Sequence, residues 1–265
     1  MKILETQLLT RCFGELRAVD GLSISVEAGE VFGLLGPNGA GKTTVIKMLC
    51  TLLPPTSGTA RVAGFDIVRQ ATDVRRMIGY VPQLLSADGS LTGYENLLVF
   101  AKLYDLPRAE RESRVREALS YMGLSEVADK MVREYSGGMI RRLEIAQSML
   151  HQPRLLFLDE PTLGLDPLAR KAVWGHIEQL RADYGTTILL TTHFMEEADN
   201  LCHRVAILYR GKVVVIGAPA DLKASVNGGD ATLDDVFIHY TGGQLEQGGD
   251  YRETARTRRT AQRLG

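Results

Sequence analysis

The stretch "GPNGAGKTT" (residues 36–44) decides the fold class of this sequence. Glycines let the backbone adopt angles that other residues resist, and they leave no Cβ between the amide groups and a ligand. The spacing fits the pattern G-x-x-x-x-G-K-[ST], in which N–H groups surround phosphates, the lysine adds positive charge and the hydroxyl binds Mg²⁺. The stretch therefore predicts a nucleotide phosphate loop made of Gly36, Pro37, Asn38, Gly39, Ala40, Gly41, Lys42, Thr43 and Thr44, with Thr43 as a ligand of Mg²⁺.

The residues on either side predict a strand before this loop and a helix after it. "VFGLL" (31–35) is an apolar run of strand length, whereas "KTTVIKMLCTLL" (42–53) has helical spacing. That helix would carry five apolar residues on one face: Val45, Ile46, Leu49, Leu52 and Leu53. "PPTSG" (54–58) supplies a stop signal. A helix N-terminus carries partial positive charge, so this order of elements favours phosphate binding over a glycine-rich turn with an incidental lysine.

Composition and charge narrow the classes of protein further. The 265 residues include 31 Lys and Arg against 32 Asp and Glu, for a net charge of −1, so no overall basic field indicates a nucleic-acid partner. Cys12, Cys50 and Cys202 are scattered, which favours small core residues in a reduced compartment over disulfides or a zinc site. No apolar run reaches the length of a membrane span. We expect a cytosolic chain, to which another polypeptide supplies any membrane span.

Two adjacent acids end a second predicted strand. In "RLLFLDEP" (154–161), four apolar residues predict a strand buried on both faces, and Asp159 and Glu160 follow at once. Ligands bind beyond the carboxyl ends of parallel strands, so Asp159 is expected near the phosphates and the Mg²⁺ held by Thr43. Glu160 beside it can orient the attacking water and accept its proton, and it is the predicted general base.

A third strand end carries a histidine. "GTTILLTTH" (185–193) has a short apolar run followed by His193. A lone histidine is more often structural. Its position at a strand end raises the alternative that His193 contacts the γ-phosphate and reports its presence, which would make it one of the catalytic residues.

A second glycine-bearing helix start lies in "EYSGGMIRRLEIAQSMLHQP" (134–153). Ser136, Gly137 and Gly138 precede apolar residues at helical spacing, so this helix start offers N–H groups to another anion. Here the sequence resembles the ATP-binding cassette (ABC) family, whose signature L-S-G-G-Q lies shortly before the acidic strand. The resemblance implies an α/β fold: a P-loop NTPase core with a mixed sheet flanked by helices, an N-terminal antiparallel β part and an inserted helical subdomain that carries the signature.

The resemblance implies roles for further residues. Gln83 in "GYVPQ" corresponds to the glutamine that senses Mg²⁺ and the attacking water, so it joins both the catalytic and the metal residues. Phe13 falls where the family stacks an aromatic ring on adenine, and Asp166 in "LGLD" belongs to the loop that bridges two ATP sites. In the family the signature contacts ATP held by the opposite subunit. This implies a head-to-tail pair of cassettes, formed by two copies of this chain or by this chain and a relative.

Further similarities indicate a branch of the family. Tyr135 and Met139 replace the leucine and glutamine of the signature, which removes one amide side chain but leaves the backbone donors intact. The stretches "YSGGMIRRLEIA" (135–146) and "TLDDVFIHYTG" (232–242) resemble the daunorubicin-resistance type of drug exporter. This similarity implies an exporter ATPase at the cytoplasmic face of the cell membrane, bound to a separate multi-spanning permease.

The chain divides into three predicted parts. Residues 1–87 and 152–220 form the nucleotide-binding core, 88–151 the helical subdomain and 221–265 a C-terminal segment with a basic tail. Helical spacing on both sides of Pro107 supports the helical subdomain. In the family this region contacts the permease, so residues 84–94 are the predicted docking segment. The arginine-rich tail (251–265) is expected to be disordered, with contact to anionic lipid as the alternative.

Two other classes stand as alternatives to transport. A soluble ABC ATPase would act on DNA or ribosomes, but the short stretch between Lys42 and Ser136 leaves no room for the long coiled coils of chromosome-maintenance members, and translation factors usually carry two cassettes. A metabolite kinase would have no use for Ser136–Gly138 beside its own phosphate loop. The motifs therefore favour a transport ATPase.

Overall fold

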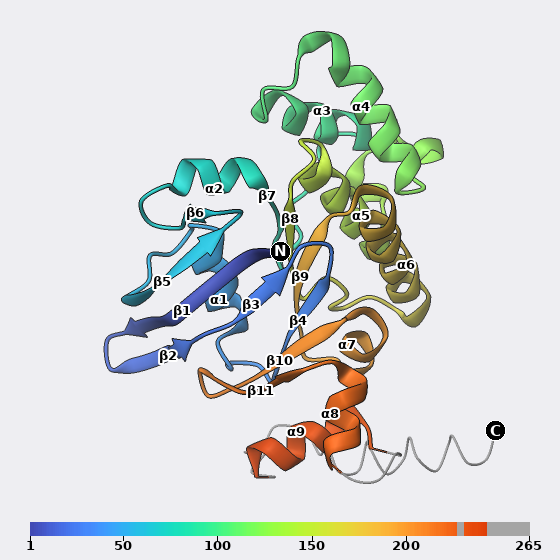
Figure 1. Cartoon of the computed structure of the whole chain (residues 1–265). Coiled ribbons are helices and arrows are strands. Elements are labelled where there is room, and N and C mark those ends of the chain that lie inside the picture. The colour runs from blue at the N-terminus through green and yellow to red at the C-terminus, as the bar shows by residue number, and fades with distance from the viewer. Residues whose placement is uncertain (227–230, 243–265) are drawn as a thin grey trace, which may run out of the picture.

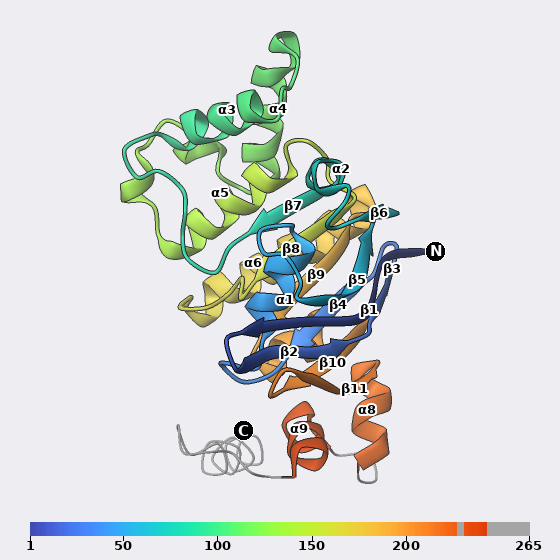
Figure 2. The ribbon, with the colours of Figure 1, turned by 90° about the vertical axis from the view of Figure 1, so that its left-hand side faces the viewer.

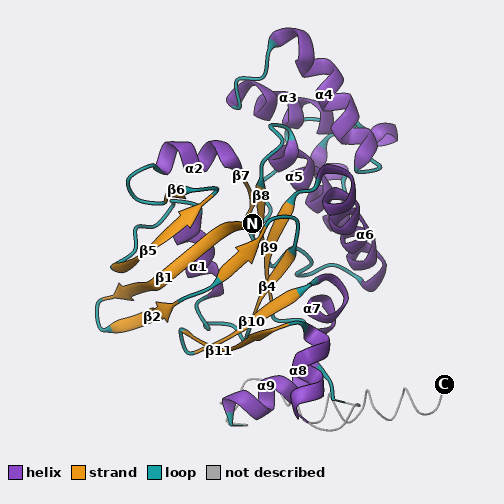
Figure 3. Ribbon diagram, viewed as in Figure 1, coloured by secondary structure: helices purple, strands orange, loops and turns teal. Residues whose placement is uncertain are grey.

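The computed structural model describes residues 1–226 and 231–242, and a six-stranded sheet forms its centre (Figures 1 and 3). Neighbouring strands pair in parallel except at the β10–β11 edge, which is antiparallel. The strand order is β11 (Lys212–Gly217), β10 (Arg204–Tyr209), β4 (Val31–Leu35), β9 (Thr187–Thr192), β8 (Leu155–Asp159) and β7 (Ile78–Val81). This mixed sheet confirms the predicted fold class.

The inner strands of this sheet are buried on both faces. Every residue of β4, β8 and β9 is buried, as the continuous apolar runs predicted. Side chains alternate between two cores because successive residues of a strand point to opposite faces. In β4, Phe32 and Leu34 belong to one core, and Val31 and Leu35 to the other.

A smaller antiparallel sheet covers one side of the central sheet (Figure 2). Its order is β2 (Leu16–Leu22), β1 (Lys2–Phe13), β5 (Ser57–Val62) and β6 (Phe65–Asp66), and β3 (Ser25–Glu27) also pairs with β1. Helix α1 (Lys42–Leu49) lies between the two sheets, and its Val45, Ile46 and Leu49 share one apolar core with Leu4, Leu9 and Phe157. This core fixes the position of α1, the helix that follows the phosphate loop.

Helix α2 (Ala71–Met77) lies beside β6, and its Val74 belongs to the same core as α1 (Figure 1). The other helices lie on the opposite side of the central sheet or beyond its β7 edge. They are α3 (Gly93–Leu103), α4 (Arg108–Tyr121), α5 (Gly137–Met149), α6 (Pro167–Tyr184), α7 (Met195–Leu201), α8 (Pro219–Val226) and α9 (Leu233–Thr241). Pro107 caps the start of α4, so the predicted break between two helices is confirmed. The boundaries of the three predicted parts stay a prediction, and α8 begins just before the predicted boundary at residue 220.

The helix predicted over residues 42–53 ends earlier than expected. It stops at Leu49, and Thr51 has a φ of 62°, a left-handed angle that an α-helix cannot contain. Leu52 therefore leaves the buried face and is 57% exposed, so its assignment to that face was wrong. Cys12 was also expected in the core and is only half-buried, whereas Cys50 and Cys202 are buried.

The C-terminal part of the described chain is a hairpin followed by two helices. Arg210 and Gly211 form the turn between β10 and β11, both with positive φ. Thr232 and Asp235 form a capping box at the start of α9, which places "TLDDVFIHYTG" in a helix. The prediction for the basic tail lies outside the described residues. Within residues 1–226 and 231–242, no helix combines the length and apolar character that crossing a bilayer requires.

Candidate nucleotide site

Parallel pairing brings three chemically important segments to one edge of the central sheet. The phosphate loop follows β4, the two acids end β8, and His193 follows β9. Leu35 at the end of β4 pairs with Thr192, and Asp159 pairs with Thr191, so the three strands end level with one another. Residues far apart in the sequence therefore meet at this edge.

The phosphate loop needs glycine at two positions where its backbone approaches neighbouring strands. A Cβ at Gly36 would lie 2.3 Å from the carbonyl oxygen of Leu208. Gly41 has a φ of 104°, and a Cβ there would lie 2.4 Å from the carbonyl oxygen of Ala18. Gly41 also precedes α1, and no side chain caps the first turn of that helix. The loop and helix start thus present backbone N–H groups, as phosphate binding requires.

Lys42 lies across the phosphate loop and reaches the acidic strand. Its side chain is only 6% exposed, and Nζ donates to the carbonyl oxygens of Gly36 at 2.7 Å and Pro37 at 3.2 Å. The same Nζ lies 3.0 Å from Glu160 Oε1 in a buried ion pair. The loop lysine and the predicted general base are therefore direct neighbours.

Asp159 joins the phosphate loop to β9 through one carboxylate oxygen. Its Oδ1 accepts hydrogen bonds from Thr43 Oγ1 at 3.1 Å and Thr191 Oγ1 at 2.6 Å. Its Oδ2 is buried and has no hydrogen-bond partner among the described residues. Buried polar atoms are rarely left unpaired, so this oxygen beside a threonine hydroxyl fits a hard cation.

Glu160 adopts a backbone conformation that non-glycine residues rarely take. Its φ is 50°, which typically costs about 1–3 kcal/mol. The backbone N–H of Glu160 donates to both the carbonyl oxygen of Thr191, at 3.1 Å, and its Oγ1, at 3.0 Å, and these bonds hold the strained turn. The strained turn directs the Glu160 carboxylate between Lys42 and His193.

His193 contacts the second oxygen of the same carboxylate, with Nδ1 2.8 Å from Glu160 Oε2. Burial alone would raise the pKa of Glu160, but the hydrogen bond to His193 and the positive charge of Lys42 outweigh burial and hold that pKa below its usual value. Glu160 is therefore ionised at neutral pH, the form that can accept a proton.

The remaining predicted residues stand apart from this cluster. Phe13, at the end of β1, is 45% exposed, and the Arg11 guanidinium lies 4.7 Å from the centre of its ring. Gln83 lies exposed after β7. Ser136 caps α5 by accepting from the N–H of Met139, and Asp166 caps α6. In the described ranges, no recorded hydrogen bond or ion pair joins these four residues to Lys42 or Glu160, and their roles in nucleotide binding stay predictions.

The comparison with protein families decides the assignment. The family model described as "ABC transporter" matches residues 19–163. The chain belongs to the ABC transporter family. This ABC protein is 47% identical over 225 residues to the daunorubicin/doxorubicin resistance ATP-binding protein DrrA of Streptomyces peucetius, covering 85% of this chain and 68% of DrrA. It is 46% identical over 227 residues to the Nod factor export ATP-binding protein I of Paraburkholderia xenovorans, covering 86% of this chain and 74% of that protein.

The solved structures agree with this assignment. The structure of an ATP-binding subunit of an ABC transporter matches this ABC protein with a TM-score of 0.79 and 31% identity, covering 90% of this chain and 99% of that one. The predicted family and fold class are confirmed, and the chain is an ATP-binding cassette with ATPase activity.

Sequence reasoning missed a buried ion pair in this ABC protein. Arg141 and Glu144 on α5 are each 2% exposed, and their side chains lie 3.0 Å apart. Arg141 donates to the carbonyl oxygens of Pro82 and Gln83 at 2.7 and 2.8 Å, and Glu144 accepts from the backbone N–H of Ser86. The signature helix therefore holds the backbone of the loop that carries Gln83. The only signal in the sequence is a pair of opposite charges three positions apart in an otherwise buried helix.

Replacing Glu144 by alanine is expected to lower the free energy of unfolding by about 3–5 kcal/mol, because Arg141 would stay buried without its carboxylate. Urea denaturation monitored by circular dichroism measures this. The matched control is Glu112→Ala, which breaks the exposed pair with Arg116, where a loss of about 0.3–0.5 kcal/mol is expected. A loss in Glu144→Ala no larger than in this control would contradict the structural role of the pair.

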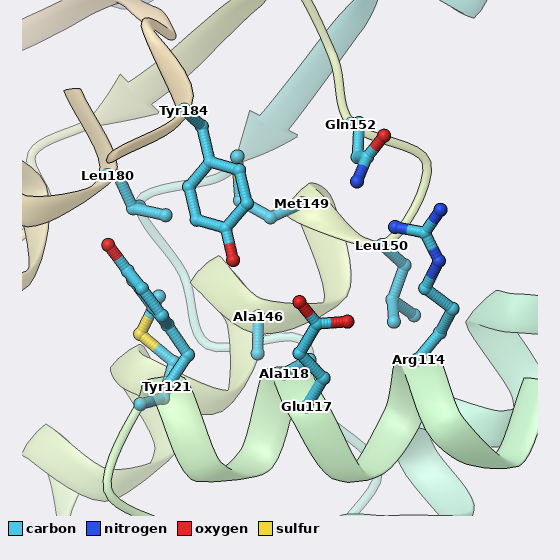
Figure 4. A pocket seen from close by; sticks show the side chains of 11 residues that line it. Arg114, Glu117, Ala118, Tyr121, Ala146, Met149, Leu150, Gln152, Leu180 and Tyr184 are labelled. Atoms are coloured by element: carbon cyan, nitrogen blue, oxygen red, sulfur yellow. The ribbon is translucent and has the colours of Figure 1, made fainter. Parts of the chain in front are cut away.

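A separate small cavity of about 50 Å³ lies between α4, α5 and α6, and none of the predicted site residues lines it (Figure 4). At its rim, Tyr121 donates a hydrogen bond to Asp183 at 2.8 Å, and its ring contacts Tyr184 edge to face at 5.3 Å. These contacts join α4 to the end of α6. The cavity is not part of the nucleotide site.

Proposed function

We propose that this chain is the ATP-hydrolysing subunit of an exporter, that its cargo is a drug or another hydrophobic compound, and that a separate multi-spanning permease forms the transport path. The observation that carries this proposal is the similarity to ATP-binding proteins named for daunorubicin/doxorubicin resistance and Nod factor export, over 85% and 86% of this chain. This function puts the protein at the cytoplasmic face of the cell membrane.

ATP binding is assigned to the loop between β4 and α1. The backbone N–H groups of residues 36–44 surround the phosphates, with Lys42 as the positive charge among them. Phe13 stacks on the adenine through its exposed ring, and Arg11 covers the ring from one side.

Mg²⁺ fits the residues at the acidic strand. Thr43 and Asp159 would hold it, with Gln83 as the third predicted ligand, and the buried Oδ2 of Asp159 supports this assignment because it has no partner among the described residues. Within the described ranges no cluster of three His, Cys, Asp or Glu side chains forms a metal site. A site with one carboxylate suits Mg²⁺, which takes few protein ligands together with phosphate oxygens. When bound, the ion neutralises charge on the phosphates.

Hydrolysis is assigned to Glu160 as the general base. Its carboxylate is ionised and held by two partners, so it can orient a water molecule and accept its proton. His193 positions that carboxylate and contacts the γ-phosphate, while Gln83 contributes from the loop after β7. The contacts of Glu160 with Lys42 and His193 support the assignment of Glu160 as the base and of His193 as the residue that positions it.

A second cassette completes each ATP site in this proposal. Ser136 and Gly137 are exposed at the start of α5, where the helix offers N–H groups to an anion. A Cβ at Gly138 would lie 2.9 Å from Ala169 Cβ, so the signature turn packs against α6, which Asp166 caps. The signature and the loop before α6 therefore form one surface, and we assign it to the ATP of a second copy or of a related cassette.

The introduction of a negative charge at Ser136 tests this dimer. In a Glu160→Gln background, ATP and Mg²⁺ are expected to produce a dimer, whereas adding Ser136→Asp should leave the protein monomeric. Aspartate still caps the helix but repels the γ-phosphate. Size-exclusion chromatography with light scattering measures the mass, and Ser136→Asn, which keeps the cap without the charge, is the control. A dimer of the Ser136→Asp variant would show that the signature does not bind phosphate.

The segment 84–94 is assigned to the permease contact. Leu84 is 81% exposed and Leu85 is 50% exposed, and the backbone on either side of them is held by Arg141 and Glu144. Two exposed leucines on a loop with a fixed backbone can pack against an apolar surface of a partner protein.

Affinity purification of the tagged full chain from its native membrane tests the proposal as a whole. A polytopic membrane protein that co-purifies, and that raises the ATPase rate when reconstituted, supports the exporter. Recovery of ribosomes or DNA without any such membrane protein favours the soluble alternative.

A further inference from the structure

A buried carboxylate outside the predicted site connects its two catalytic segments. Glu197 on α7 is fully buried, with 0% exposure. Its Oε1 accepts two hydrogen bonds, from Thr162 Oγ1 at 2.7 Å and from Trp174 Nε1 at 2.9 Å. These donors come from the loop after β8 and from α6, so one oxygen joins three elements.

Glu197 contacts or adjoins the two segments that follow Glu160 and His193 in the chain. Thr162 lies on the loop that Glu160 begins, and it is fully buried. Helix α7 follows His193 directly after the end of β9. A displacement of either Glu160 or His193 would therefore strain the bond between Thr162 and Glu197.

The environment of Glu197 differs from that of a carboxylate in an ion pair. Burial raises the pKa of Glu197, the hydroxyl groups of Thr192 and Thr162 and the indole N–H of Trp174 oppose the rise, and the nearby charge of Glu160 adds to it. Its second oxygen, Oε2, has no hydrogen-bond partner among the described residues. A buried acid costs folding free energy unless its hydrogen bonds offset the loss of solvation, and well-packed apolar residues of similar volume often replace buried charged groups without loss of stability.

We propose that Glu197 is a positioning residue for ATP hydrolysis, which keeps the loop after Glu160 and the segment after His193 in the relative placement that catalysis needs. Trp174, the single tryptophan of the chain, donates to the same Glu197 oxygen as Thr162, so its fluorescence can report on this placement. The proposal rests on the proposed roles of Glu160 and His193.

Steady-state kinetics of the full-length protein test this role. Glu197→Ala is expected to lower kcat by roughly 10- to 100-fold, because small misplacements of catalytic groups carry penalties of this size, while KM for ATP changes less than about twofold. Glu197→Gln should recover most of the rate, since its amide oxygen accepts the same two hydrogen bonds. Glu196→Gln changes the exposed neighbouring carboxylate on the same helix and should behave as wild type.

Tryptophan fluorescence provides a readout that a purely structural role would not change. ATP with Mg²⁺ is expected to shift the Trp174 emission of the wild type and of Glu197→Gln, and the shift should be lost in Thr162→Val, which removes only one hydroxyl donor and keeps the side-chain shape. Thr162→Val is also expected to lower kcat about tenfold. This variant tests the link even where Glu197→Ala does not fold.

The outcomes separate this inference from the proposed function. A wild type that hydrolyses ATP, together with Glu197→Ala and Thr162→Val variants of unchanged kcat, would overturn the positioning role alone. A wild-type emission that does not respond to ATP would overturn the link through Trp174. A folded wild type without ATPase activity would overturn the proposed function, and the positioning role with it.

Discussion

Glu160→Gln is expected to lower the rate of ATP hydrolysis by about 10²- to 10⁴-fold, the usual contribution of a general base. Glutamine has nearly the same shape as glutamate, but its amide cannot accept the proton of an attacking water. ATP affinity should change little, because the phosphate loop and Lys42 remain in place. Phosphate release under steady-state conditions measures the rate, and isothermal titration calorimetry measures ATP binding.

The structure supplies a matched control for this experiment. Glu178→Gln alters an exposed carboxylate on α6 and should retain the wild-type rate. A Glu160→Gln variant that binds ATP and hydrolyses it within about twofold of wild type would remove Glu160 from the role of base, since the loss of a general base costs at least about 10²-fold.

Lys42→Ala is expected to weaken ATP binding by about 10- to 100-fold. Hydrogen bonds from charged groups contribute about 1.5–3 kcal/mol each, and every 1.4 kcal/mol is a factor of ten in affinity. Calorimetry with ATP and Mg²⁺ measures the change. Lys47→Ala removes an exposed lysine from the same helix and should bind ATP normally. Equal affinity in Lys42→Ala and wild type would exclude the phosphate contact.

The same lysine also affects folding stability, since its removal leaves the buried Glu160 with only His193 as a partner. Breaking a buried pair commonly costs about 3–5 kcal/mol, so Lys42→Ala should unfold at lower urea concentration. The double variant Lys42→Ala with Glu160→Gln should recover part of this loss, because no uncompensated charge remains. If Lys42→Ala and the double variant are equally destabilised, the ion pair contributes nothing to folding.

The elements that form the candidate site could be predicted from local patterns. Four apolar residues before Asp159 indicated a strand buried on both faces, and β8 is that strand. The glycines and Lys42 indicated a phosphate loop between strand and helix, which β4 and α1 confirm. The end of α1 was predicted too late, because the apolar spacing continues past the left-handed turn at Thr51 and so gives no sign of it.

The contacts within the site could not be predicted in the same way. Nothing in "LDEP" indicates that Glu160 takes a left-handed backbone angle, since that angle is imposed by the bonds from its N–H to Thr191 on the neighbouring strand. Nor does any local pattern pair Arg141 with the carbonyl oxygen of Gln83, because the two residues lie on separate elements.

The sequence by itself determined the family, the alternation of strands and helices, and the residue types at the ends of three strands. These features could be predicted because glycine spacing, apolar periodicity and helix caps depend on residues that are close neighbours in the chain. Only the tertiary structure decided that Lys42 pairs with Glu160, that Asp159 keeps one oxygen without a partner among the described residues, and that Glu197 joins Thr162 to Trp174. These contacts depend on the register of parallel strands and on how helices pack over them, and strand register is set by pairing between distant segments.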